Sequence, residues 1–116
     1  MGFSSERRYY RLDFPPKERP EFVVGNVSMP VAEVSEGGMR YEPVADHAPE
    51  IGEQVTGTVK FKRAGEVEVI GTVSRRQGPT IVLIFERPGL PYAAIMQEQR
   101  FLMKRYADRF RGKGSR

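Results

Sequence analysis

The sequence has no cysteine and only one histidine, and this scarcity excludes several classes of function. Without cysteine the chain cannot form a disulfide, a thiolate metal site or a cysteine nucleophile. His47 alone cannot build a histidine-clustered zinc site, and it argues against an ordinary hydrolytic triad. No apolar run approaches the roughly 20 residues that cross a membrane, and the first residues show no signal-peptide pattern. We therefore expect a cytoplasmic protein that is not an enzyme and that holds no metal or cofactor.

The length and the charge of the chain indicate one domain with basic ends. A chain of 116 residues is long enough for a single domain, over residues 1–116, with a modest core. The net charge of +4 divides into +2 over residues 1–19, −4 over residues 20–99 and +6 over residues 100–116. Basic ends favour an anionic partner such as a nucleic acid, a nucleotide or a membrane surface. Basic tails that serve only solubility have the same composition, so charge leaves both interpretations open.

Short segments with β-sheet patterns occupy the middle of the chain. In one of them Val55, Val59 and Phe61 alternate with polar residues, which is the period-two pattern of a strand with one buried face. Turn residues separate these segments, and no helical pattern lies between them. This arrangement predicts an antiparallel barrel or sandwich. The predicted strands, all within a barrel at 21–88, cover residues 21–24, 27–34, 39–41, 55–61, 67–74 and 81–85.

The two ends of the chain are predicted to differ from this body. Residues 1–20 contain Pro15-Pro16, which disfavours a continued helix and indicates an extended, flexible arm. In residues 92–111, apolar side chains recur at spacings of three, four and seven, which predicts an amphipathic helix packed on the barrel. Glu98 is expected to lie off the apolar stripe of this helix.

The arm carries a first group of candidate binding residues, Arg7, Arg8 and Arg11. A guanidinium group donates two parallel charge-assisted hydrogen bonds to a phosphate, and its flat face stacks on a base. Several such groups in one arm can converge on one anion, although basic arms without any ligand are common. The adjacent Tyr9 and Tyr10 are expected to pack against the barrel.

A second group follows the predicted strand at 27–34 and comprises Glu33, Ser35 and Gly38. A carboxylate can accept hydrogen bonds from N1–H and the exocyclic amine of guanine, and a hydroxyl can bond a base edge or a phosphate. Alternatively, the serine and the glycine only build the turn. A further phosphate or stacking contact could come from Arg75 and Arg76. Alternatively, these two side chains are simply solvated.

In this order the motifs resemble the PilZ domain over nearly the whole chain. The resemblance implies a bacterial receptor for cyclic di-GMP, built as an all-β, six-stranded antiparallel β-barrel with a C-terminal helix. The matching segments are Glu-Arg-Arg-Tyr-Tyr-Arg-Leu (6–12), Val-Ser-Glu-Gly-Gly-Met-Arg (34–40) and Glu-Gln-Arg-Phe-Leu-Met-Lys-Arg-Tyr (98–106).

The resemblance also implies roles for the two groups of candidates. It assigns the ligand phosphates and guanine faces to Arg7 and Arg11, with Arg8 as a helper, and a guanine contact to the second group. The family usually has Asp or Asn where this sequence has Glu33, so we expect that contact to shift or weaken. Ligand binding is expected to close the arm, with an affinity near micromolar, or about −8 kcal/mol.

A downstream protein is the expected reader of the closed arm, and the chain is expected to be a monomer or a weak dimer. No nucleic-acid polymer is expected as a partner, because the central strands are net acidic and offer few surface aromatics. Two other functions stay open at this point. The chain could be a β-barrel that binds RNA or single-stranded DNA, or an interaction module that docks a partner without any nucleotide.

Overall fold

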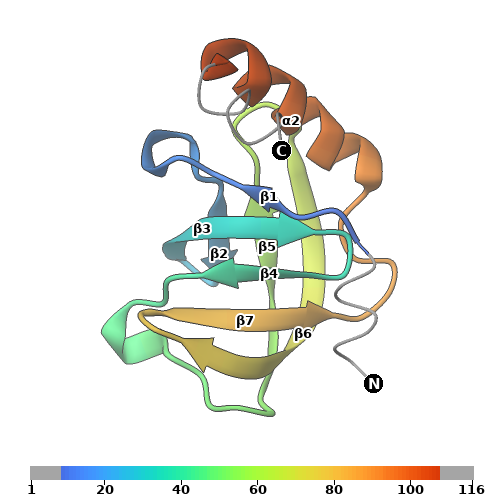
Figure 1. Ribbon diagram of the computed structural model, residues 1–116. Helices are drawn as coiled ribbons and strands as arrows, with labels where there is room; N and C mark the ends of the chain where they lie inside the picture. Colours follow the sequence, from blue (N-terminus) through green and yellow to red (C-terminus); the bar gives the residue numbers. More distant parts are fainter. Residues whose placement is uncertain (1–8, 108–116) are drawn as a thin grey trace.

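Seven strands and one α-helix make up residues 9–107, the part of the chain that the structure, a computed structural model, describes (Figure 1). The helix is α2 (Tyr92–Arg105), and two 3-10 helices are η1 (Pro16–Glu18) and η2 (Ala45–His47). No helix in the described range is long and apolar enough to span a membrane. The strands are β1 (Leu12–Asp13), β2 (Glu21–Val24), β3 (Val27–Ser35), β4 (Gly38–Tyr41), β5 (Gln54–Lys60), β6 (Glu66–Gln77) and β7 (Thr80–Phe85).

Six of the strands close into an antiparallel barrel. In the order β3-β2-β5-β6-β7-β4 each strand pairs with the next, and β4 pairs back with β3. The short β1 is an additional strand on β3, and α2 lies across one end of the barrel (Figure 1). The predicted six-stranded antiparallel barrel with a C-terminal helix is therefore confirmed. A closed barrel pairs the backbone groups that an open sheet would leave at its edges.

The barrel interior is filled by the residues that alternate inward along each strand. Val59 of β5, predicted to face inward, has no exposed surface, and Phe61 just beyond it is also buried. Phe22 and Tyr41 meet in the core with ring centroids 5.0 Å apart at an interplanar angle of 68°, an edge-to-face contact. This packed core fixes the register of the strands, because a slip by one residue would turn every inward side chain outward.

Part of the expected arm belongs to the folded body. Leu12 and Phe14 are 1% and 4% exposed, and the backbone N–H of Phe14 donates to the carbonyl of Ala32 over 2.9 Å, continuing the pairing of β1 with β3. The arm was expected to extend to residue 20, but the structure joins the chain to the barrel from Leu12 onward. The reason is apolar burial, since two large side chains leave water at this point.

Glu98 of α2 corrects the predicted helical pattern. Ile95 and Leu102 of the expected apolar stripe are indeed buried, yet Glu98 lies among them with 0% exposure. Its carboxylate accepts hydrogen bonds from the backbone N–H groups of Arg63 and Ala64, at 2.9 and 2.8 Å, and from Nη1 of Arg63 at 3.1 Å. These donors lie in the turn between β5 and β6. The carboxylate therefore fastens the helix to that hairpin.

Arg63 extends this contact to the amino-terminal segment. Its Nη2 donates to Oε1 of Glu18 at 2.7 Å, and its guanidinium carbon lies 3.2 Å from the ring centroid of Phe101. The hydroxyl of Tyr106 donates to the other carboxylate oxygen of Glu18 at 3.0 Å. We call this set of Glu18, Arg63, Glu98 and Tyr106 the buried charge network.

Replacement of Glu98 by glutamine should lower the free energy of unfolding by about 3–5 kcal/mol, because it breaks a buried ion pair and removes one of the two carboxylates that Arg63 contacts. Urea denaturation measures this change. As a control, Glu66→Gln removes one partner of an exposed ion pair with Lys60 and should cost only about 0–1 kcal/mol. Similar small effects for both variants would contradict the role given to Glu98.

Stability should also depend on the ionisation of Glu18. The hydrogen bond from Arg63 lowers the pKa of Glu18 against the opposing effect of burial, and the hydrogen bond from Tyr106 lowers it further. A carboxyl with a lower pKa in the folded state stabilises the fold above its unfolded pKa, and this contribution is lost as pH falls through the folded value. The free energy of unfolding should therefore fall on acidification below about pH 4.5, the ordinary pKa of this group. Denaturation curves recorded at several pH values measure this change. The free energy of unfolding of Glu18→Gln should depend less on pH than that of the parent chain, and an equal dependence would exclude Glu18 as the cause.

Candidate functional site

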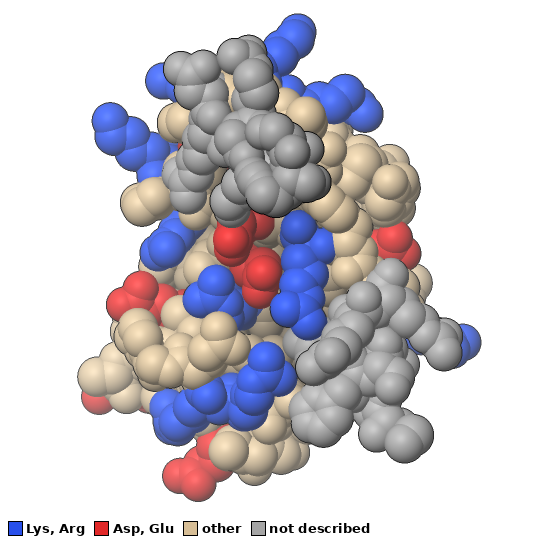
Figure 2. All heavy atoms as spheres, in the orientation of Figure 1, with Lys and Arg blue, Asp and Glu red and all other residues tan. Residues whose placement is uncertain are grey.

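A pocket of about 120 Å³ lies on the outer face of the barrel, across β3, β4, β7 and β6. Figure 2 views this side of the molecule and shows Lys and Arg side chains around acidic side chains near the centre. Three arginines and one glutamate line the pocket, so its charge is positive. The lining residues are Arg11, Glu33, Val34, Ser35, Gly38, Met39, Arg40, Arg75, Gln77 and Val82.

The sheet register brings these residues together from distant parts of the sequence. Glu33 is opposite Arg40, Arg40 is opposite Val82, and Val82 is opposite Arg75. Directly opposed residues of antiparallel strands have their side chains on the same face of the sheet. The barrel therefore presents one acidic and two basic side chains on one surface. The predicted ligand residues that line this pocket are Arg11, Glu33, Ser35, Gly38 and Arg75.

A bulge in β6 separates Arg75 from Arg76. The register of β6 on β7 shifts at Ser74, which leaves this residue without an opposed partner. Arg75 then lies opposite Val82 on the outer face, whereas Arg76 lies opposite Ile81, a fully buried core residue. Arg76 is therefore on the other face of β6 and does not line the pocket. The predicted ligand residues that lie outside the described residues are Arg7 and Arg8.

The turn between β3 and β4 has a structural role of its own. The hydroxyl of Ser35, which is 4% exposed, donates to the carbonyl of Gly38 at 3.3 Å. A Cβ atom on Gly38 would lie 2.6 Å from the carbonyl oxygen of Leu83, so only glycine lets β4 approach β7 this closely. Ser35 and Gly38 therefore build the turn, and both also line the pocket.

The residues before β1 are seated on the same turn. The ring of Tyr9 covers Gly37, where an added Cβ atom would lie 2.6 Å from the ring. Tyr10 is 47% exposed, and burial of the rest of its side chain, together with Tyr92, raises the pKa of its hydroxyl. The expected packing of Tyr9 against the barrel thus occurs at the edge of the pocket. Arg11 follows two residues later and enters the lining.

Arg40 is a pocket residue that the sequence reasoning missed. Its Nε lies 3.5 Å from Oε1 of Glu33, and its Nη2 lies 3.6 Å from Oδ1 of Asp13. The Nε atom is buried and makes no hydrogen bond in the structure. One guanidinium thus holds together β1, β3 and β4 beneath the pocket. The signal was present in the alternation of β4, where Met39 and Tyr41 face inward and Arg40 must face outward.

The chemistry of this lining suits an anion that also carries a hydrogen-bonding edge. Arg11 can donate two parallel hydrogen bonds to a phosphate. Glu33 can accept from paired N–H groups of a base, because its carboxylate is only partly engaged by Arg40. Arg75 donates from Nη2 to Oε1 of Gln77 at 3.3 Å, which sets its guanidinium along the rim.

Comparison with known proteins identifies the fold. No family model and no curated protein matches this sequence. The PilZ domain of YcgR from Escherichia coli, solved with c-di-GMP, is 18% identical with a TM-score of 0.56, over 92% of this chain and 98% of that chain. The uncharacterised Legionella protein Lpg0364 is also 18% identical, with a TM-score of 0.57, over 93% of this chain and 100% of that chain.

A third similar structure is the Bacillus subtilis inhibitor of motility, MotI/DgrA. It is 12% identical with a TM-score of 0.56, and the match covers 88% of this chain but 51% of that one. The present chain thus spans about half the length of this relative. At these identities the likeness concerns the arrangement of the backbone. The chain has the fold of a PilZ domain, as its motifs predict.

Proposed function

We propose that this chain is a receptor for cyclic di-GMP and that the outer-face pocket, together with the arm before it, forms the binding site. The observation that supports this proposal is the convergence of Arg11, Glu33 and Arg75, three separate segments of the sequence, on one positively charged pocket. The PilZ domain of YcgR, which has a similar fold, was solved with c-di-GMP. A receptor of this kind needs no catalytic group.

Each residue has a role that follows from its chemistry. Arg11, with Arg7 and Arg8 of the arm, donates to the ligand phosphates and stacks on guanine faces. Glu33 accepts from N1–H and the exocyclic amine of a guanine. Arg75 adds a contact at the rim, while Ser35 and Gly38 form the polar edge of the turn against which the base lies. Arg76, on the other face of β6, is a candidate for a contact outside this pocket.

The position of the arm bears on the strength of binding. Ordering an arm of about eight residues would cost about 1–2 kcal/mol of backbone entropy for each residue. From Tyr9 onward the chain already rests on the barrel, and from Leu12 it is paired with β3. Fewer residues then lose freedom on binding. We propose a dissociation constant of micromolar or below, about −8 kcal/mol or more favourable.

A protein partner that reads the bound state would approach from the arm. Tyr10 and Tyr92 are 47% and 54% exposed and lie close enough for one to raise the pKa of the other. Tyrosine is common in protein interfaces because it combines apolar area with a hydroxyl. We propose that ligand binding changes the presentation of these two side chains to a downstream protein.

Isothermal titration of the whole chain with cyclic di-GMP tests the proposed function. Arg11→Ala should weaken binding about 10- to 100-fold, because a charge-assisted hydrogen bond contributes about 1.5–3 kcal/mol. The matched control is Arg100→Ala, which removes an exposed arginine of α2 outside the pocket and should bind as the parent does. No heat with the parent at tens of micromolar would overturn the function. Equal binding by both variants would remove Arg11 from the site.

Arg40 should matter through its hold on Glu33 and Asp13. In Arg40→Met the pocket loses a positive charge and the carboxylate of Glu33 loses its anchor, so cyclic di-GMP should bind about tenfold more weakly, a cost of about 1.4 kcal/mol. Lys60→Met removes the same charge from an exposed pair distant from the pocket and serves as control. The same titration measures both variants. Unchanged affinity in Arg40→Met would leave this arginine with a purely structural role.

A further inference from the structure

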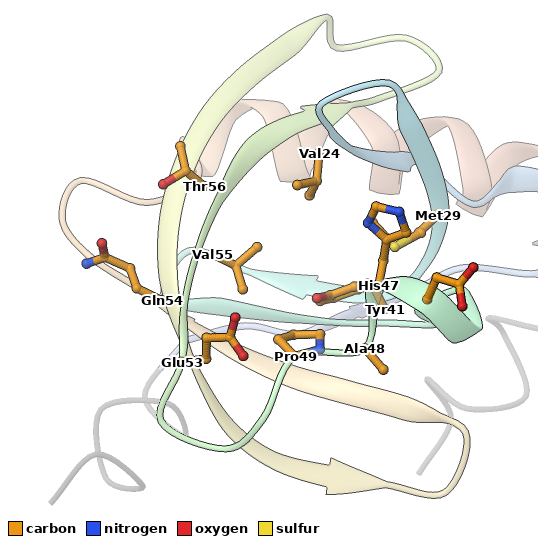
Figure 3. A pocket seen from close by; sticks show the side chains of 11 residues that line it. Val24, Met29, Tyr41, His47, Ala48, Pro49, Glu53, Gln54, Val55 and Thr56 are labelled. Carbon is orange, nitrogen blue, oxygen red and sulfur yellow. The ribbon is translucent and has the colours of Figure 1, made fainter.

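The barrel has a second and larger pocket at its open mouth, with a volume of about 330 Å³ (Figure 3). It lies at the end of β5 that begins with Gln54, whereas α2 is fastened beyond the opposite end, at Arg63. It shares no residue with the outer-face pocket. The lining residues are Val24, Met29, Tyr41, Asp46, His47, Ala48, Pro49, Glu53, Gln54, Val55 and Thr56.

The inner wall of this mouth pocket is apolar and continuous with the core. Met29 and Tyr41 are each 1% exposed, and Val24 and Val55 pack against the same core from the rim. Figure 3 shows these side chains pointing into the mouth from different strands. An apolar group placed here would contact core side chains directly. A volume of about 330 Å³ falls at the small end of the roughly 300–1,000 Å³ that ligand pockets occupy.

The rim of the mouth pocket is acidic in a chain whose net charge is +4. Asp46 and Glu53 contribute two carboxylates, and its lining contains no Lys or Arg among the residues that the structure describes. Burial and the charge of Glu53 raise the pKa of Tyr41 to about 12. The phenol therefore stays protonated at neutral pH.

The acidic rim is held in place by the connection from β4 to β5. The backbone N–H of Glu50 donates to Oε1 of Glu53 at 2.9 Å, and the carbonyl of Glu53 accepts from Val73 at 2.9 Å. At its other end the connection is fixed by the N–H of Glu42, which donates to the carbonyl of Pro30. Between these two ends the connection contains the 3-10 helix η2, which carries Asp46. A carboxylate fixed by its own backbone is preorganised for a ligand.

We propose that the mouth pocket binds a small organic cation, an amine with a compact apolar body. The ammonium group lies at the rim, where Glu53 accepts its hydrogen bonds and Asp46 adds negative charge, and the apolar body contacts Met29 and Val55. Charge-assisted bonds fix the orientation, and burial of the apolar part supplies the rest of the affinity. This site is independent of the proposed cyclic di-GMP site, because a ligand with two phosphates would meet two carboxylates here.

Titration of the isotopically labelled full chain, followed by NMR, tests the proposal with three probes of one shape. These are 2-phenylethylamine as the cation, 2-phenylethanol as the neutral analogue and 3-phenylpropionate as the anion. We expect saturable shifts at the amides of Met29, Asp46 and Val55. The dissociation constant of the cation should be about 1 mM, and that of the anion at least tenfold larger. No saturable shift, or equal binding of the anion, would overturn the proposal.

Substitutions on one loop separate charge from shape. Glu53→Gln should weaken the binding of 2-phenylethylamine about tenfold and leave the binding of 2-phenylethanol unchanged. Asp46→Asn should weaken the binding of the amine in the same way. The matched control is Glu50→Gln, an exposed residue whose side chain does not line the pocket. Cyclic di-GMP titration of Glu53→Gln should match the parent, which distinguishes the two sites. Equal effects of Glu50→Gln and Glu53→Gln on the amine would contradict a specific carboxylate contact.

Discussion

The carboxylate of Glu98, buried at the end of the barrel, is the interaction on which the arrangement of the other parts depends. Removing a carboxylate from water costs several kcal/mol, and here two backbone N–H groups and the guanidinium of Arg63 offset that cost. Through Arg63 the same charge holds Glu18, and Glu18 follows β1 by a few residues. Three segments that are remote in sequence thus meet at one ion cluster. The segment that follows β1 is therefore held by a contact on the helix.

The closed barrel separates two surfaces of opposite charge by strand alternation alone. Arg40 and Tyr41 are neighbours on β4, yet the first lines the basic outer-face pocket and the second lines the acidic mouth. Successive residues of a strand point to opposite faces, so one step along the chain crosses the wall of the barrel. A net charge of +4 says nothing of this division. The wall of the barrel keeps the two charges apart, so the basic pocket favours an anion and the acidic mouth favours a cation.

The sequence predicts the barrel well because strand patterns are local. The alternation at β5 and the apolar run at β7 each carry their own signal, and the expected bounds agree with Gln54–Lys60 and Thr80–Phe85 to within one or two residues. Glu98 could not be predicted, because its donors belong to a turn some 35 residues away. Likewise the separation of Arg75 from Arg76 depends on a bulge, whose position is set by pairing with β7. The errors lie where a residue's role is decided by a partner distant in sequence.

The turn at Glu36 and Gly37 connects the outer-face pocket to the helix. Its two carbonyls accept hydrogen bonds from Leu90 and Phe85, at 3.1 and 2.8 Å. Phe85 is the last residue of β7, and Leu90 lies in the connection from β7 to α2. On its other side, Gly37 supports the ring of Tyr9 at the root of the arm. The turn beside the outer-face pocket is therefore joined by backbone hydrogen bonds to the end of β7 and to the connection that leads into α2, the helix that Glu98 fastens to the barrel.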